Sequence, residues 1–385
     1  MNASLFESTL LLTKELVRFP SVSHESNESV SRFVADRLSA MRFEIEWHQY
    51  LDEKGESKVS IVAKRGNGTG GVCYLAHTDV VPADDWSFGS SGPFDPTEQD
   101  SRLYGRGTCD MKGSLACAIQ AASQIDPLSQ AKPIYFVVTS DEEVGMLGAK
   151  TVDAHSALFQ EMVDTDVVGI VGEPTCLQVI HAHKGAQRLA IRARGRSAHT
   201  STNDGINANY QLIPALQKLL DIRWESETNP IYHNALFDPP TLSWNMNIVN
   251  EPEAVNVTPS LAQANVFMRT MPNVDHQPLL DAIKNLCDEH GLELELRDGI
   301  APWSVPVDGG WVRDMLTLVN RPDSHSVCFA TDAGILQRLK RLLVCGPGDI
   351  QQAHRSDEWI SMDQLERGVD VYRRAFLHWA CASKV

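Results

Sequence analysis

The sequence of 385 residues lacks several features that would point to particular classes of protein. It has no uninterrupted apolar stretch near the roughly 20 residues that a membrane helix needs. Its apolar N-terminal residues are interrupted by Glu7, Lys14 and Glu15, so no secretory leader is expected. None of the eight cysteines forms a Cys-x-x-Cys pair, and several lie in apolar runs, as core thiols do. We therefore expect a protein of the reducing cytoplasm without a membrane partner.

Positive charge is also scarce. The chain has 34 lysines and arginines against 50 acidic residues, a formal net charge of −16. This balance argues against a nucleic-acid partner and an anionic membrane surface, and it is compatible with a cationic small substrate. The length favours two domains, because a single hydrophobic core rarely grows so large.

Ligand-type side chains follow three apolar runs of strand type. The run that starts at Ile134 ends in three consecutive carboxylates, Asp141-Glu142-Glu143, which repel one another unless cations lie there. A second run ends at His77, and a third ends at Glu173. In an open α/β sheet the ends of such strands face one crevice, so we expect these residues to converge.

Two further residues, Asp110 and His354, lie in turn-rich loops that can face the same crevice. The combined set of imidazoles and carboxylates suits zinc and similar divalent ions. The predicted metal ligands are His77, Asp110, Glu143, Glu173 and His354. Five ligands are too many for one catalytic zinc, but they are enough for two ions if one carboxylate bridges. The sequence therefore predicts two divalent metal ions, zinc first, with cobalt as the alternative.

Two acids next to these ligands have predicted roles in catalysis. Glu142 is left over as the general base, which would take a proton from a metal-bound water and return it to a leaving nitrogen. Asp79, two residues after His77, is expected to orient that imidazole through its second ring nitrogen. Any one of these residues alone has an ordinary structural explanation: Asp110, for example, could cap the helix expected at 114–123. The metal prediction rests on the ordered set.

The middle of the chain changes character and predicts an inserted domain. Between residues 179 and 297 the expected order is strand, helix, strand, strand, helix, strand, a split βαβ unit. Its elements are expected at 188–194, 207–221, 242–248, 262–269, 277–289 and 292–296. We predict an α/β fold: a mixed-sheet catalytic domain of the zinc-hydrolase type (1–178 and 298–385) with an inserted βαββαβ, ferredoxin-like dimerisation domain (179–297).

Five ordered motifs resemble those of metallopeptidase family M20. They are His77-Thr-Asp79, Gly107-Thr-Cys-Asp-Met-Lys-Gly113, Asp141-Glu-Glu143, Gly172-Glu-Pro-Thr175 and Gly346-Pro-Gly-Asp-Ile-Gln-Gln-Ala-His354. The resemblance implies that Asp110 bridges the metals, that His77 and Glu173 complete one site, and that Glu143 and His354 complete the other. Glu142 would be the base.

The resemblance also implies a homodimer formed by the inserted unit. His199 would then reach across to the partner's active site and stabilise the oxyanion. Arg269 and Asn256 are similar to family positions that contact the substrate carboxylate.

Within the family, Ala182-His-Lys-Gly185 and the run that ends at His354 resemble the acetylornithine deacetylase branch. The predicted substrate is N2-acetyl-L-ornithine. N-acetylcitrulline, succinyl-diaminopimelate and a dipeptide are alternatives, because Thr331-Asp332 stands where the branch typically has Thr-Glu. A non-catalytic, metal-dependent protein that binds amino acids is the alternative from another class.

Overall fold

The computed structural model describes residues 3–381 and divides into two compact units. The first contains the chain up to His181, residues Val305–His325 and the chain from Thr331; the second contains Ala182–Ser304 and Ser326–Ala330. The expected insertion at 179–297 lies close to this second unit, and its role in dimerisation stays a prediction. None of the helices formed by residues 3–381 combines the length and apolarity needed to cross a membrane.

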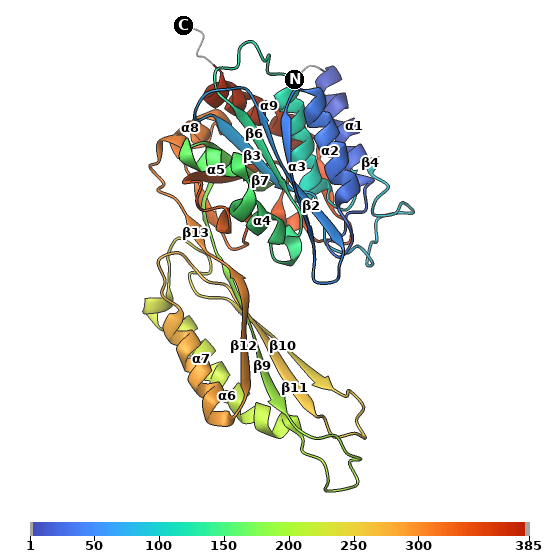
Figure 1. Ribbon diagram of the computed structural model, residues 1–385, viewed down its shortest axis with the longest axis vertical. Coiled ribbons are helices and arrows are strands. Elements are labelled where there is room, and N and C mark those ends of the chain that lie inside the picture. The colour runs from blue at the N-terminus through green and yellow to red at the C-terminus, as the bar shows by residue number, and fades with distance from the viewer. Residues whose placement is uncertain (1–2, 382–385) are drawn as a thin grey trace. The chain divides into compact units, whose positions relative to one another are not determined.

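The first unit is built on a mixed sheet whose central strands are parallel (Figure 1). Its first six strands follow the order β1-β2-β6-β3-β7-β15. The bounds are β1 Glu44–Leu51, β2 Ser57–Arg65, β6 Ile134–Thr139, β3 Val72–His77, β7 Val168–Pro174 and β15 Arg341–Gly346. Every residue of β3, β6 and β7 is buried, which explains their nearly continuous apolar sequences.

Helices cover both faces of this sheet (Figure 1). One hydrophobic core joins the sheet to α1 Ala3–Val17, α2 Glu28–Ala40, α3 Gly113–Ser123, α8 Gly310–Val319 and α9 Met362–Ala380. Ile61 and Ala63 of β2 face that core, whereas Lys64 points the other way and pairs with Glu161 of α5 Ala157–Asp164. Helices α4 Leu147–His155 and α5 therefore lie on the opposite face.

Short strands complete the first unit and connect it to the second. Three of them form a small sheet in the order β16-β5-β4. Its bounds are β16 Trp359–Ser361, β5 Arg102–Tyr104 and β4 Thr97–Gln99. At the boundary between the units lie β8 Ile180–His183, β13 Trp303–Ser304 and β14 His325–Val327.

The second unit has the predicted βαββαβ order and an antiparallel sheet, β10-β11-β9-β12. Its elements are β9 Ala186–Arg194, α6 Ala208–Thr228, β10 Trp244–Glu251, β11 Leu261–Met268, α7 Gln277–His290 and β12 Glu293–Ile300. Helices α6 and α7 share a core with one face of the sheet (Figure 1). The prediction of an α/β fold with a mixed sheet and a separate βαββαβ unit is confirmed.

Candidate metal centre

Four parallel strands bring most of the predicted ligands to one edge of the sheet. Strands β6, β3, β7 and β15 are neighbours in that order and run in parallel. His77 ends β3, where it aligns with Thr139 at the end of β6, and Glu173 lies next to the last residue of β7. Glu143 follows β6 in a single 3-10 turn. His354 follows β15 after a similar turn at 350–352.

Asp110 comes from outside this sheet. It lies between β5 and α3, in an irregular helical turn at Thr108–Lys112 that is buried throughout. The residue itself is 7% exposed. The prediction that Asp110 precedes a helix is confirmed, because α3 begins at Gly113.

The two oxygens of the Asp110 carboxylate face two different imidazoles. Oδ1 lies 3.1 Å from Nε2 of His77, and Oδ2 lies 3.4 Å from Nε2 of His354. Nε2 of His77 is also 3.8 Å from Glu173 Oε1, and Nε2 of His354 is 3.0 Å from Glu143 Oε2. The five residues thus form two groups of three that share Asp110.

These separations fit two divalent ions. Four ligands at about 2.1 Å around a tetrahedral zinc lie about 3.4 Å from one another. The four distances between ligand atoms, 3.0 to 3.8 Å, scatter around that value. Each group offers three protein ligands and so leaves one coordination position open, which is the arrangement of catalytic zinc sites.

The carboxylates of the centre crowd one another. Burial, followed by repulsion from Asp110, raises the pKa of Glu173 well above its ordinary value. Burial also raises the pKa of Glu142 and of Glu143, with further contributions from neighbouring acids. A cation among these groups acts in the opposite direction, because it stabilises their ionised forms.

The two histidines dominate the electrostatics of Asp110. Burial alone would raise the pKa of Asp110, but hydrogen bonds from His354 and His77 outweigh it and hold that pKa far below its ordinary value. The hydrogen bonds that His354 donates to the carboxylates of Asp110 and Glu143 raise the pKa of His354 to about 10. Among the carboxylates of the two groups, Asp110 therefore stays ionised most readily beside the two imidazoles.

Asp79 lies where the sequence predicts it, but its contacts differ from the expectation. Nδ1 of His77 is 2.9 Å from the main-chain oxygen of Asp79 and 3.7 Å from its carboxylate. The carbonyl is the nearer acceptor for the ring. The carboxylate instead accepts the backbone N–H groups of Glu142 and Glu143, at 3.2 and 3.3 Å. Asp79 therefore fixes the turn that carries the predicted base.

The negative charge of one of the three consecutive acids is balanced by a buried lysine. Asp141 forms an ion pair of 3.1 Å with Lys58, whose side chain is 1% exposed, and accepts a hydrogen bond of 2.8 Å from Tyr50. Only Glu142 and Glu143 therefore remain to face the centre. Sequence reasoning missed Lys58, although a lysine inside an apolar strand is a signal for a buried partner.

Sequence reasoning also left Asp332 without a structural role. Its Oδ2 accepts a hydrogen bond of 2.6 Å from Thr139, at the end of β6, and burial raises its pKa to about 6. Asp332 follows the strand-like run at 327–331, and this position is the sequence signal that could have indicated a place near the strand ends.

The three remaining predicted residues belong to the second unit, and the structure brings two of them together. His199 is exposed and forms an isolated bridge with Val257, and the N–H of Thr200 donates to the oxygen of Asn256. Arg269 lies elsewhere, directly after β11, where its backbone N–H donates to Ser243. The eight residues of β11 span roughly 26 Å between these two places.

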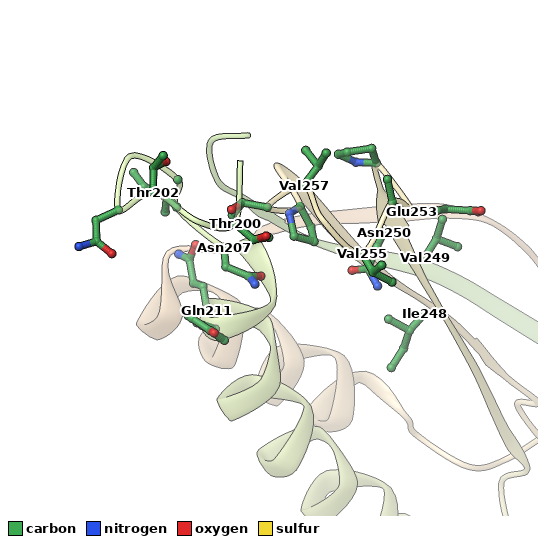
Figure 2. A pocket seen from close by; sticks show the side chains of 18 of the residues that line it. Thr200, Thr202, Asn207, Gln211, Ile248, Val249, Asn250, Glu253, Val255 and Val257 are labelled. Atoms are coloured by element: carbon green, nitrogen blue, oxygen red, sulfur yellow. The ribbon is translucent and has the colours of Figure 1, made fainter. Parts of the chain in front are cut away.

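A wide hollow of about 1280 Å³ lies in the second unit, and Thr200, the residue after His199, is part of its lining (Figure 2). Residues 200–211 and 247–259 contribute its walls, and the labelled side chains Thr202, Asn207, Gln211 and Val255 show how mixed its lining is. Among the described residues, the two groups able to hold a metal both lie in the first unit. The residues that line the hollow include none of the residues of these two groups.

Comparisons with known proteins agree with this picture. Residues 73–378 match the model of peptidase family M20/M25/M40. The chain is 33% identical to an acetylornithine deacetylase of Proteus mirabilis, over 97% of each chain. Its fold is similar to that of an M20 family metallo-carboxypeptidase of Sulfolobus solfataricus (TM-score 0.75, 16% identity, 96% and 98% of the chains). It is also similar to a dinuclear metal binding peptidase of the same family from Bacillus subtilis (TM-score 0.65, 12% identity, 98% and 99%).

Proposed function

Because this chain belongs to peptidase family M20/M25/M40, we propose that it is a two-metal amidohydrolase that removes the acetyl group from N2-acetyl-L-ornithine, giving L-ornithine and acetate. The observation that carries the two-metal chemistry is Asp110, whose two oxygens each lie within 3.4 Å of a different imidazole. The identity of 33% to an acetylornithine deacetylase, over nearly the whole chain, favours the substrate.

The ligands of the two ions are, in this proposal, His77, Asp110 and Glu173 for one and Asp110, Glu143 and His354 for the other. Two divalent ions, zinc or cobalt, would lower the pKa of a water molecule and polarise the substrate carbonyl. Both ligand groups combine imidazole and carboxylate, which suits these metals.

Glu142 is the proposed general base. It takes a proton from the attacking water as the oxygen–carbon bond forms, and it gives that proton to the nitrogen as the carbon–nitrogen bond breaks. Its backbone is fixed by the hydrogen bond to Asp79, and its neighbour Glu143 belongs to the ligand set. The side chain would therefore lie beside the two ions without being one of their proposed ligands.

Three residues of the second unit are proposed to contact the substrate: His199 at the oxyanion, and Arg269 and Asn256 at the carboxylate. Within one chain, His199 and Asn256 are separated from Arg269 by the length of β11, roughly 26 Å. One small substrate cannot touch both ends of that strand. The separation supports a homodimer in which His199 and Asn256 serve the partner's site.

The second unit also has a surface suited to such a dimer, which we call the α6–β10 face. It comprises the apolar residues Ile206, Tyr210, Leu220, Trp224, Trp244 and Ile248. Tyr210 is 78% and Trp224 67% exposed, and an exposed apolar patch is typical of a protein–protein interaction site. In addition, β10 is an edge strand of its sheet, so within the described residues one of its sides has no neighbouring strand.

A substrate panel tests the proposed activity. The zinc-loaded protein is given N2-acetyl-L-ornithine, N-acetylcitrulline, succinyl-diaminopimelate and a dipeptide, and free amine is measured. We expect the highest kcat/KM with N2-acetyl-L-ornithine. A preference for the succinyl compound or the dipeptide would overturn the substrate. Binding of all four without release of amine would identify a non-catalytic binding protein.

A further inference from the structure

A buried ion pair, neither of whose residues is a proposed metal ligand, connects three of the chain segments that carry the proposed ligands. Arg106 and Glu358 are each 1% exposed, and Nη1 of Arg106 donates to Glu358 Oε2 at 2.8 Å. Burying two charges is costly unless their remaining hydrogen-bonding positions are also satisfied. What they contact in addition to each other therefore indicates what the pair does.

Glu358 holds the turn that presents Asp110. Its Oε1 accepts the backbone N–H groups of Cys109 and Asp110, at 2.9 and 3.1 Å, and its Oε2 accepts that of Gly107 at 3.0 Å. With the bond from Arg106, this carboxylate accepts four hydrogen bonds, the number that its two oxygens can take. Three of the four fix backbone within the segment 107–110.

Arg106 holds the two segments that carry the histidines. Nη1 donates to the main-chain oxygen of Arg355, the residue next to His354, at 3.1 Å. Nη2 donates to the main-chain oxygen of Pro82, a few residues after His77 and Asp79, also at 3.1 Å. A guanidinium can serve both carbonyls and a carboxylate at once because its five N–H groups form a rigid, planar fork.

His354 has particular need of such support. Its φ of 63° lies in the left-handed region, which is unfavourable for a residue with a β-carbon and persists only where the surroundings impose it. The strand pairing of β16 with β5 brings residue 358 next to residues 105–107, and the hydrogen bond from Gly105 N to Glu358 O reinforces it. The ion pair then extends this main-chain connection to the ligands themselves.

We propose that Arg106 and Glu358 are positioning residues that hold Asp110 and His354 in the relative geometry required for metal binding. The inference rests on the proposed metal centre and adds to it two residues that are not ligands. Partners of this kind around metal ligands typically change metal affinity by about 10- to 100-fold when they are altered.

The test compares Glu358→Gln with a matched control, Glu161→Gln. Both substitutions remove an acid that pairs with a cation, but Glu161 contacts Lys64 and Tyr135, on the opposite face of the sheet from the main core. Zinc dissociation constants are measured by competition with a chelator, and the melting temperature of the metal-free protein is measured separately.

We expect Glu358→Gln to weaken zinc binding by about 10- to 100-fold, because its amide group would face backbone N–H donors. Glu161→Gln should leave the zinc dissociation constants unchanged. Should Glu358→Gln fail to fold, Arg106→Lys provides the same test, since it keeps the charge and loses the fork that reaches Pro82 and Arg355. For that variant we expect weaker zinc binding, accompanied by a lower kcat at saturating zinc and an unchanged KM.

A folded variant of Glu358 or Arg106 that melts at a lower temperature yet binds zinc as tightly as the unaltered chain would overturn the inference, and it would leave the proposed function intact. An unaltered chain that binds no zinc would instead remove the proposed function itself.

Discussion

The strands of the two units differ in how deeply they are buried and in the residues that follow them. In the first unit, β3, β6 and β7 are buried along their whole length and lead into residues that can bind a cation. In the second unit, β11 alternates between buried and partly exposed residues, and the described residues offer no comparable ligand group there. The difference places both candidate metal-binding groups in the first unit. The notable features of the second unit are exposed: the α6–β10 face, the hollow and the side chain of His199.

The largest effect should come from Glu142→Gln. Removal of the general base should lower kcat by about 10³-fold or more, while zinc content and substrate binding stay close to those of the unaltered protein. The measurements are steady-state kinetics, metal analysis and calorimetric titration with N2-acetyl-L-ornithine. Near-normal turnover would show that the base is another residue.

His199→Ala should have a smaller effect, a loss of about 10²-fold in kcat, as expected for an oxyanion donor. Mixing this variant with Glu142→Gln tests which chain's active site His199 serves. If His199 acts on the partner's site, half of the randomly re-formed dimers contain one intact site, and the mixture should recover roughly a quarter of the original activity. A mixture as inactive as its components would place His199 at its own chain's site or at none.

Trp224→Glu should separate the dimer, because a charge on the α6–β10 face cannot be buried without a partner. We expect a monomer in light scattering and an activity loss at least as large as that of His199→Ala, because a monomer lacks both His199 and Asn256 of its partner. The matched control is Leu128→Glu, at a residue of the first unit that is 94% exposed. A fully active monomer would contradict the assignment of the second unit to dimerisation.

Chelation should distinguish the two metal sites by a smaller, kinetic difference. The side chain of His354 is 54% exposed, whereas that of His77 is 1% exposed, so the ion held with His354 should leave first. We expect two phases of zinc release into a coloured chelator, and only the slow phase in His354→Ala. A single phase in both proteins would show that the two sites do not differ in access.

The smallest effect concerns stability in the second unit. Burial lowers the pKa of His183 to about 4, so the folded chain keeps this ring neutral at pH values where the unfolded chain protonates it. Stability should therefore fall as the pH drops below about 6.5, by about 2 kcal/mol at pH 5 from this residue alone. Urea titrations at about pH 7.5 and 5 should show that loss reduced in His183→Gln. An unchanged loss would mean that other groups cause it.

The sequence supports the convergence of His77, Glu143 and Glu173, because the ends of buried parallel strands must meet. It could not assign partners inside the acidic cluster. Asp141 turns to Lys58 and Asp79 to the backbone of Glu142, and such choices depend on side-chain directions that only the packed structure sets. The pair Arg106–Glu358 joins residues that are 252 positions apart, so no local sequence pattern predicts it.

The elements of the second unit were predicted in the right order but with inexact ends. Helix α6 was expected to end at residue 221, and it continues to Thr228. Its final turns carry Trp224 on the exposed side, so the apolar pattern there does not follow the buried face that sequence reasoning used.

The most direct measurement is the anomalous scattering of zinc in crystals of the metal-loaded protein. We expect two peaks in the first unit of each chain, one bound by His77 and Glu173 and the other by Glu143 and His354, with Asp110 between them. A single peak, or two peaks that do not share Asp110, would contradict this expectation.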